Sequence, residues 1–290
     1  MKLSVTFVLI LTSVRAEGIR NPLSAILPPK DDRPKVLLQG LDLLALPDEE
    51  VELTATLERR RGSTFFMPVA GETIHFFLKG RRVGTARTSA IGKAVLPYRF
   101  EKAGDFTIRI SFSKRSAESA GSGGIFVRVA ESDTRYVLTD IEKTLHSQNA
   151  VRFPFIPNRD IPPLTGARKA LQKFAGIRSI LYLSSGDGRA AGKVRTWLDS
   201  YGFPGGPVFH LSLPHDPEAA ARRKMEQLGR IRRRFPNLLA GIGNRRSDAI
   251  ACQENQMASF LIMPVPEKNL PTGTHAYPSW EHLYKALFFK

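Results

Sequence analysis

Two patterns of hydrophobic and polar positions divide the chain. From Val51 to Val129 apolar and polar residues alternate, as in the run Val51, Leu53, Ala55 and Leu57, which predicts strands that bury one face. Glycine or proline lies in nearly every gap, and short strands at such spacing indicate a β-sandwich. The further strands expected here are Thr73–Leu78, Val83–Thr88, Ala94–Phe100, Asp105–Phe112 and Ile125–Val129.

After Glu131, short apolar strands alternate with stretches of helical spacing. This alternation predicts a doubly wound parallel sheet, in which ligands bind at the carboxyl ends of the strands. The expected strands are Tyr136–Leu138, Ile180–Leu183, Leu238–Ile242 and Phe260–Met263. The expected helices carry the apolar sets Ala167, Ala170, Leu171 and Phe174, then Val194, Trp197, Leu198 and Tyr201, then Met225, Leu228 and Ile231.

The two patterns indicate two domains in a chain of 290 residues, a length that permits this. We expect a β-sandwich over residues 33–131 and the α/β domain over residues 133–290. A composition with 42% hydrophobic residues excludes a disordered, collagen-like or coiled-coil chain. The single cysteine, Cys252, excludes an intramolecular disulfide, and no cysteine and histidine cluster has the spacing of a zinc site.

The amino-terminal residues have the pattern of an export signal. Lys2 precedes an apolar run from Leu3 to Val14, and a small residue ends the segment at Ala16. The run is shorter than the roughly 20 residues of a membrane span. We therefore expect a signal peptide over residues 1–16 and a protein in the bacterial periplasm or outside the cell. The alternative is a buried first strand, because residues 5–8 are rich in β-branched side chains.

Polar side chains follow the predicted strands of the α/β domain. Asp140 and Glu142 follow the first strand, Ser184 and Ser185 follow the second, and Asn244 and Asp248 follow the third, while Lys224 lies in a basic helix. Each feature alone has an ordinary structural interpretation as a cap, a βα turn or a solvated charge. Together they predict hydroxyl, amine and carboxylate groups that meet at one edge of the sheet.

The segments that contain these residues resemble sequence motifs of a known superfamily. Residues 140–145 (DIEKTL) resemble the D-x-D-x-T motif of haloacid dehalogenase phosphatases. Residues 182–185 (YLSS) and 243–248 (GNRRSD) are similar to later motifs of the lipin, or phosphatidate phosphatase, type, as are residues 202–207 and 215–217. In the sandwich, the turns at residues 92–94 and 103–107 resemble those of bacterial immunoglobulin-like domains, which says nothing about activity.

The resemblance implies a role for each residue. Asp140 is the expected nucleophile, Ser184, Ser185 and Lys224 are the expected phosphate-binding groups, and Glu142 has the place of the general acid and base. The implied cofactor is Mg²⁺, held by Asp140, the backbone carbonyl of Glu142, Asn244 and Asp248. The sequence departs from the motif at Glu142, where the superfamily has a second aspartate, and at Lys143, where a small residue is usual.

Charge indicates an anionic partner. The chain has 43 Lys and Arg against 27 Asp and Glu, a net charge of +16, and residues 222–234 hold seven of these basic residues. A solvated helix is the ordinary interpretation of such a segment. The functional interpretation is that the segment binds an anionic lipid or membrane surface. Aromatic residues are not interleaved with the basic ones and no nucleic-acid module is present, so no specific nucleic-acid binding is expected.

Two kinds of function remain open from the sequence. The first is a Mg²⁺-dependent hydrolase of a phosphomonoester, such as phosphatidate or another anionic lipid phosphate, that works through an aspartyl-phosphate. The second is a catalytically weak or inactive module that binds phosphatidate or phosphate with the same residues. Glu142 favours the second, while Asp140, Ser184, Lys224 and Asp248 favour the first. A third, weaker interpretation is an interaction protein in which the sandwich is the functional domain.

Overall fold

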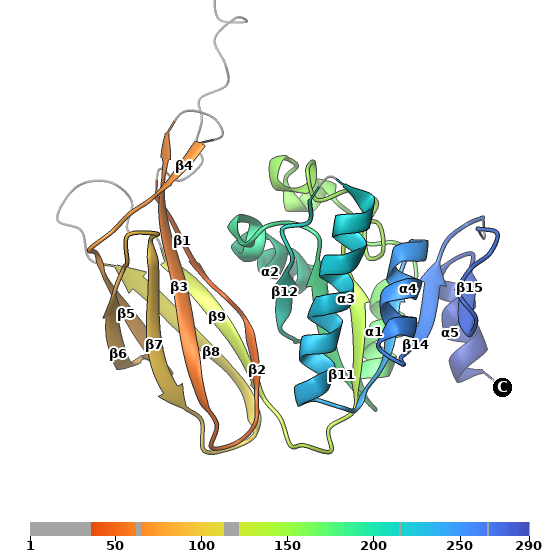
Figure 1. Cartoon of the computed structure of the whole chain (residues 1–290), viewed down its shortest axis with the longest axis horizontal. Helices are drawn as coiled ribbons and strands as arrows, with labels where there is room; N and C mark the ends of the chain where they lie inside the picture. Colours follow the sequence, from red (N-terminus) through yellow and green to blue (C-terminus); the bar gives the residue numbers. More distant parts are fainter. Residues whose placement is uncertain (1–35, 62–64, 113–121, 215, 266, 290) are drawn as a thin grey trace, which may run out of the picture. The chain divides into compact units, whose positions relative to one another are not determined.

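The protein is described by a computed structural model that covers residues 36–61, 65–112, 122–214, 216–265 and 267–289 (Figure 1). Two β-sheets form the part before residue 130, and a parallel sheet between helices forms the part after residue 135. The predicted fold class, an immunoglobulin-like sandwich followed by a doubly wound parallel sheet, is confirmed. The expected signal peptide, residues 1–16, lies outside the described residues.

The sandwich buries one face of each of its two sheets. Its core joins Leu53 and Leu57 from one sheet with Ile74, Ile108 and Ile125 from the other, and all five side chains are fully buried. The first sheet contains β1 (Val36–Gly40), β3 (Glu50–Arg61), β4 (Phe65–Pro68) and β7 (Lys93–Arg99). The second has the order β2 (Leu43–Ala45), β9 (Ser122–Val129), β8 (Gly104–Phe112), β5 (Thr73–Leu78) and β6 (Arg81–Arg87).

Three sandwich strands were not predicted, and each lacks the alternation that reveals the others. β2 has only three residues, and β1 begins with three adjacent apolar residues, Val36, Leu37 and Leu38. β4 exposes apolar side chains, with Phe65 75% and Met67 44% accessible, so it has no polar face to alternate with. β4 pairs with the distal half of β3, where Arg61 lies opposite Phe65.

The α/β part contains one parallel sheet of six strands. Its order is β12 (Val208–His210), β11 (Ser179–Ser184), β10 (Tyr136–Asp140), β13 (Leu238–Gly243), β14 (Ala258–Ile262) and β15 (Thr274–Tyr277). The chain therefore moves outward from β10 in one direction, then returns to pair β13 with the other side of β10. Strands β12 and β15 were not predicted, because they are short and lie at the two edges of the sheet.

Helices cover both faces of this sheet (Figure 1). Ile180 and Tyr182 of β11 point to the face with α1 (Ala167–Ala175), α2 (Ala191–Ser200) and α5 (Trp280–Phe288). The alternate residues, Leu181 and Leu183, point to the face with α3 (Pro217–Arg234) and α4 (Arg246–Glu254). Burial on both faces explains why these strands are continuous apolar runs. Three short 3₁₀ segments, Phe153–Phe155, Asn158–Asp160 and Gly188–Ala190, lie in the connections.

Among the helices of the described residues, none is both long and apolar enough to cross a bilayer. The longest, α3, has 18 residues and is the basic segment noted above.

His146 is a buried neutral side chain in the core of the α/β part. Its ring stacks on Phe153 with centroids 4.9 Å apart and meets Trp197 edge-on, and Nδ1 accepts a hydrogen bond from the backbone N–H of Gln148. Burial lowers the pKa of His146 to about 4. The neutral ring therefore contributes its full stability above the unfolded-state pKa of about 6.5, and that contribution is lost as pH falls towards 4.

Between pH 7 and pH 4, the free energy of unfolding of the parent protein should fall as His146 becomes protonated. In a His146→Phe variant we expect this fall to be smaller by about 3 kcal/mol. The variant keeps an aromatic ring against Phe153 and has no group to protonate. Urea unfolding at the two pH values measures the difference, and other titrating groups cancel because both proteins share them. An equal fall in the two proteins would contradict the argument.

Candidate active site

The polar residues singled out from the sequence lie where the strand order reverses. β10 and β13 are neighbours in the sheet, but the chain leaves them in opposite directions, and doubly wound sheets bind ligands in the crevice at such a point. Asp140 is the last residue of β10, Ser184 is the last of β11, and Asn244 follows β13. The parallel strands bring all three to one edge of the sheet.

Lys224 joins the two aspartates at this edge. Its Nζ donates to Asp140 Oδ1 at 3.0 Å and to Asp248 Oδ1 at 2.6 Å. All three side chains are buried. The neighbouring Arg222 and Arg223 are exposed, so the structure distinguishes Lys224 from the other cations of α3. Lys224 reaches the sheet because it lies on the same helix face as Leu228 and Ile231, four and seven residues later.

The charges in this cluster depend on one another. Burial raises the pKa of Asp140 to about 7, against the attraction of Lys224. Burial would also raise the pKa of Asp248, but Lys224 and two backbone N–H groups hold it below its usual value. Burial alone would lower the pKa of Lys224, and the two carboxylates instead raise it. Lys224 and Asp248 thus form a charged pair, whereas burial opposes ionisation of Asp140.

Asp248 is held by the start of its own helix. Its Oδ2 accepts hydrogen bonds from the backbone N–H of Asn244 at 2.9 Å and of Arg245 at 3.0 Å, which caps α4. A Cβ atom at position 243 would lie only 2.4 Å from Asp248 Oδ2, so Gly243 is needed for this approach. The G-N-R-x-x-D spacing therefore places a carboxylate against the turn that follows β13.

Glu142 is hydrogen-bonded to the end of β11. Its Oε1 accepts a hydrogen bond from Ser184 Oγ at 2.7 Å, and its Oε2 accepts one from the backbone N–H of Ser185 at 2.8 Å. Glu142 and Ser184 are buried. Burial raises the pKa of Glu142, and the hydrogen bonds from Ser185 and Ser184 oppose that shift. The carboxyl group is therefore held by the donors that the sequence assigned to phosphate.

Two further residues support the site. Thr144 Oγ1 lies 3.3 Å from Asp140 Oδ2 and 3.3 Å from Asn244 Oδ1, so its hydroxyl links the first and third polar segments. The Thr144 carbonyl accepts a hydrogen bond of 2.6 Å from the Trp280 indole. Thr144 could be found from the sequence as the last position of the D-x-D-x-T pattern. Trp280 lies 136 residues away, and no sequence pattern connects the two.

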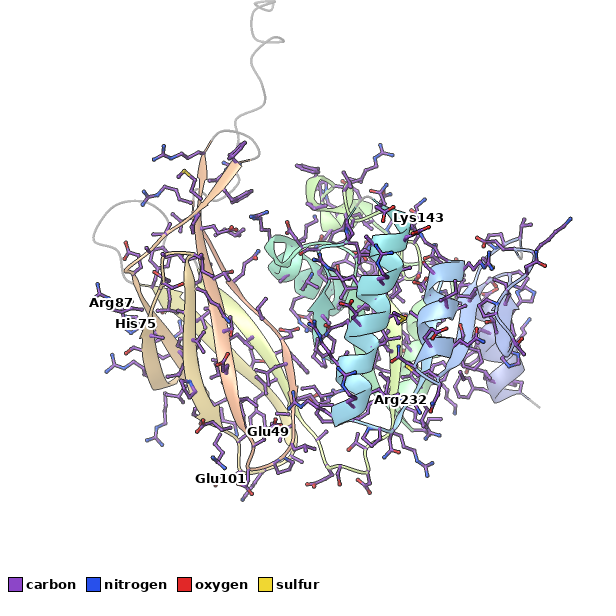
Figure 2. All side chains as sticks on the ribbon, in the orientation of Figure 1. Glu49, His75, Arg87, Glu101, Lys143 and Arg232 are labelled. Atoms are coloured by element: carbon purple, nitrogen blue, oxygen red, sulfur yellow. The ribbon has the colours of Figure 1, made fainter. Side chains whose placement is uncertain are left out.

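Lys143 lies at the surface beside the site. It has a left-handed backbone, with φ of 59°, and an exposed side chain, so its bulk and charge do not enter the buried cluster. Figure 2 shows Lys143 at the end of the α/β part where the strands finish, with Arg232 at the opposite end. The departure from the motif at residue 143 thus leaves the buried groups undisturbed.

The donor set suits a hard divalent cation. Asp140 and Asp248 offer carboxylate oxygens, Asn244 an amide oxygen and Glu142 a backbone carbonyl, and such oxygen ligands are those that Mg²⁺ prefers. The site buries three carboxyl groups and one amine, that of Lys224, so it has excess negative charge when all are ionised. Within the described residues, no three side chains of His, Cys, Asp or Glu together form a metal-holding group. A cation here would rest on two carboxylates, with the other oxygens and water completing its shell.

Comparisons with known proteins identify similar solved structures. No protein-family model matches the sequence, and no curated protein sequence matches it. Haloacid dehalogenase-like hydrolases match over the carboxyl-terminal half, and fibronectin type III and CARDB domains match over the amino-terminal third.

For three of these structures we give the sequence identity, the share of each chain that is covered and the TM-score. The magnesium-bound HAD-hydrolase YfnB from Bacillus subtilis is 13% identical over 53% of this chain and 99% of its own, with a TM-score of 0.37. The cobalt-bound deoxy-D-mannose-octulosonate 8-phosphate phosphatase from Haemophilus influenzae is 13% identical over 53% and 87%, with a TM-score of 0.35. The fibronectin(III)-like modules of CbhA from Clostridium thermocellum are 14% identical over 33% and 98%, with a TM-score of 0.24.

Proposed function

We propose that the protein is a Mg²⁺-dependent phosphomonoester hydrolase that forms an aspartyl-phosphate on Asp140. The observation that carries the proposal is the buried set of Asp140, Lys224 and Asp248 at the reversal point of the sheet, with the Ser184 hydroxyl at the end of the next strand. The motifs of the lipin type, at residues 140–145 and 243–248, make phosphatidate or another anionic lipid phosphate the proposed substrate.

The residues divide the reaction into two displacements. An Asp140 oxygen attacks phosphorus, the bond to the ester oxygen breaks, and Glu142 donates a proton to that leaving oxygen. Water then attacks the phosphorus of the aspartyl-phosphate, Glu142 takes the proton of this water, and phosphate leaves with Asp140 restored. Lys224 neutralises charge shared by Asp140 and the phosphoryl group. Bound Mg²⁺ would supply further neutralisation of the phosphoryl oxygens.

Purified protein tests this proposal directly. We expect Mg²⁺-dependent release of inorganic phosphate from dioleoyl phosphatidate in mixed micelles and from p-nitrophenyl phosphate. Release from the aryl phosphate alone would retain the hydrolase and remove the lipid substrate. No release from either, at any divalent cation concentration, would overturn the hydrolase proposal.

A binding module is the second candidate, and the contacts of Glu142 favour it. Ser184 and Ser185 already donate to this side chain, so the groups that would hold a phosphoryl oxygen are engaged within the protein. Such a site could bind phosphate or phosphatidate slowly or weakly and turn it over poorly. Binding of phosphate without turnover would select this candidate.

The arginines at the end of α3 are proposed to contact an anionic lipid surface. Arg230 and Arg233 are exposed, while Arg232 is half-buried and donates to the carbonyl of Asn255. In a parallel sheet with helical crossovers, the carboxyl end of α3 lies at the edge opposite the candidate site, and Figure 2 shows Arg232 at that end. At 1.5 Å per residue, Arg233 is about 14 Å further along the helix than Lys224. These arginines would hold the protein on a surface without delivering a headgroup to Asp140.

We expect Arg230→Gln with Arg233→Gln to weaken binding to vesicles that contain phosphatidylserine by roughly thirtyfold at low salt, because each basic residue near such a surface contributes about 1 kcal/mol. The control is Arg81→Gln with Arg82→Gln, which removes equal charge from exposed positions on β6. Vesicle co-sedimentation at two salt concentrations measures both variants. Equal affinity of the α3 variant and the parent would remove this surface role.

Export is the proposed fate of the chain, based on the apolar run Leu3 to Val14. We expect the mature protein, expressed in a Gram-negative bacterium, to be recovered from the periplasm with its amino terminus near Glu17. Edman sequencing of the purified protein checks this. Intact chains that begin at Met1 in the cytosolic fraction would contradict it.

A further inference from the structure

The carboxylate of Glu142 is arranged as a bound oxyanion would be. Its two oxygens accept from different donors, Oε1 from the Ser184 hydroxyl at 2.7 Å and Oε2 from the Ser185 backbone N–H at 2.8 Å. Two neighbouring oxygens of a phosphoryl group can accept from the same pair of donors, because both groups present charged oxygens of similar spacing. Hydrogen bonds to charged acceptors are shorter and stronger than those between neutral groups.

The turn after β11 closes around this contact. The backbone N–H of Gly186 donates to Ser184 Oγ at 3.2 Å, which orients the hydroxyl towards Glu142. A Cβ atom at Gly186 would lie 3.9 Å from Glu142 Oε1 and 3.8 Å from Ala150 Cβ. Glu142 is only 6% exposed and Ser184 is fully buried. The side chain of Glu142 therefore satisfies both donors.

Lys224 is directed elsewhere in the same cluster. Its amine donates to Asp140 and Asp248, at 3.0 and 2.6 Å, and not to Glu142. A phosphoryl group in contact with Asp140 could share Lys224 without breaking the ion pairs. It could reach Ser184 and the Ser185 N–H only after Glu142 leaves them.

We propose that Glu142 is an internal ligand of the phosphoryl-binding donors, so that the described conformation is self-inhibited and an oxyanion enters by displacing this side chain. The inference rests on the proposed function, whose phosphate-binding groups are Ser184, Ser185 and Lys224. It assigns Glu142 a second role beside proton transfer, as a residue that competes with the substrate. The aspartate found at this place in the motif is one methylene shorter and, from the same backbone, would not extend as far towards the two donors.

Titration with inorganic phosphate, followed by calorimetry in excess MgCl₂, tests the displacement without any need for turnover. We expect Glu142→Asp and Glu142→Ala each to bind phosphate at least tenfold more tightly than the parent. Glu142→Asp keeps the negative charge, so a gain in this variant reports freed donors and not reduced repulsion. Glu142→Gln loses the charge but keeps the length, and its gain should be smaller than that of Glu142→Ala.

A double variant identifies the donors. In a Ser184→Ala background, the gain from Glu142→Asp should fall to about threefold or less, because one of the two contested donors is gone. Thermal unfolding of every variant shows whether it is folded before its affinity is compared. Equal phosphate affinity of the parent and the folded Glu142→Asp variant would overturn the inference, as would no phosphate binding by any variant. Neither result bears on phosphate release from p-nitrophenyl phosphate or phosphatidate, which decides the hydrolase proposal.

Discussion

Asp140→Asn is expected to lower the rate of Mg²⁺-dependent phosphate release by at least about a thousandfold, since loss of a nucleophile removes the covalent step entirely. The asparagine amide is nearly the same size as the carboxyl group and can still accept from Lys224, which lies 3.0 Å from Oδ1. The change therefore removes the reactive oxygen and its charge while the packing of β10 is kept. Phosphate release from p-nitrophenyl phosphate and from phosphatidate measures the effect.

Two further variants make this result specific. Asp248→Asn should also abolish activity, because it removes a proposed metal ligand and a partner of Lys224. Asp133→Asn changes an exposed aspartate before β10 and should leave activity unchanged. Lys224 keeps one carboxylate partner in either active-site variant, so both proteins should remain folded, which thermal unfolding checks. Activity retained in Asp140→Asn would rule out the aspartyl-phosphate mechanism.

The regular parts of the fold could be predicted because their patterns are local. Alternation in β3 and β8, and continuous apolar runs in β10, β11 and β13, follow from burial of one face or of both. Helix α4 was not predicted, because its buried apolar residues are small and its first turn is the polar motif itself. Helix α5 was not predicted, although it packs Trp280 against the same core as α1.

From the sequence, the site residues could be predicted to lie at one edge of the parallel sheet, but their hydrogen-bond partners could not be predicted. Met225, Leu228 and Ile231 were predicted to form the apolar face of α3, whereas the buried positions are 224, 228, 229 and 231, with Met225 only half-buried. The buried face of this helix includes a lysine because two carboxylates satisfy its charge. Hydropathy alone counts that lysine as a surface residue. The contact between Glu142 and Ser184 depends on the length of one side chain, which no spacing reveals.

The reach of Glu142 leads to the second large effect that we expect: Glu142→Asp should raise turnover of p-nitrophenyl phosphate. A general acid works within about 2.6–3.2 Å of the leaving oxygen, and a displacement of about 1 Å can change the rate on the order of a hundredfold. The longer glutamate is held at the end of β11 by Ser184 and Ser185, and is not free to follow a leaving oxygen. An aspartate from the same backbone would be shorter and less firmly held there.

Metal affinity separates this explanation from a change at the cation. The proposed ligand from residue 142 is its backbone carbonyl, which Glu142→Asp leaves in place, so the Mg²⁺ concentration for half-maximal activity should be unchanged. The rise should lie in kcat, because the chemical step improves, and in a lower KM where displacement of residue 142 limits binding. A competing view holds that the pocket has adapted to the glutamate. Turnover by Glu142→Asp at or below that of the parent, with Mg²⁺ dependence unchanged, would support that view and reject the misplacement of the general acid.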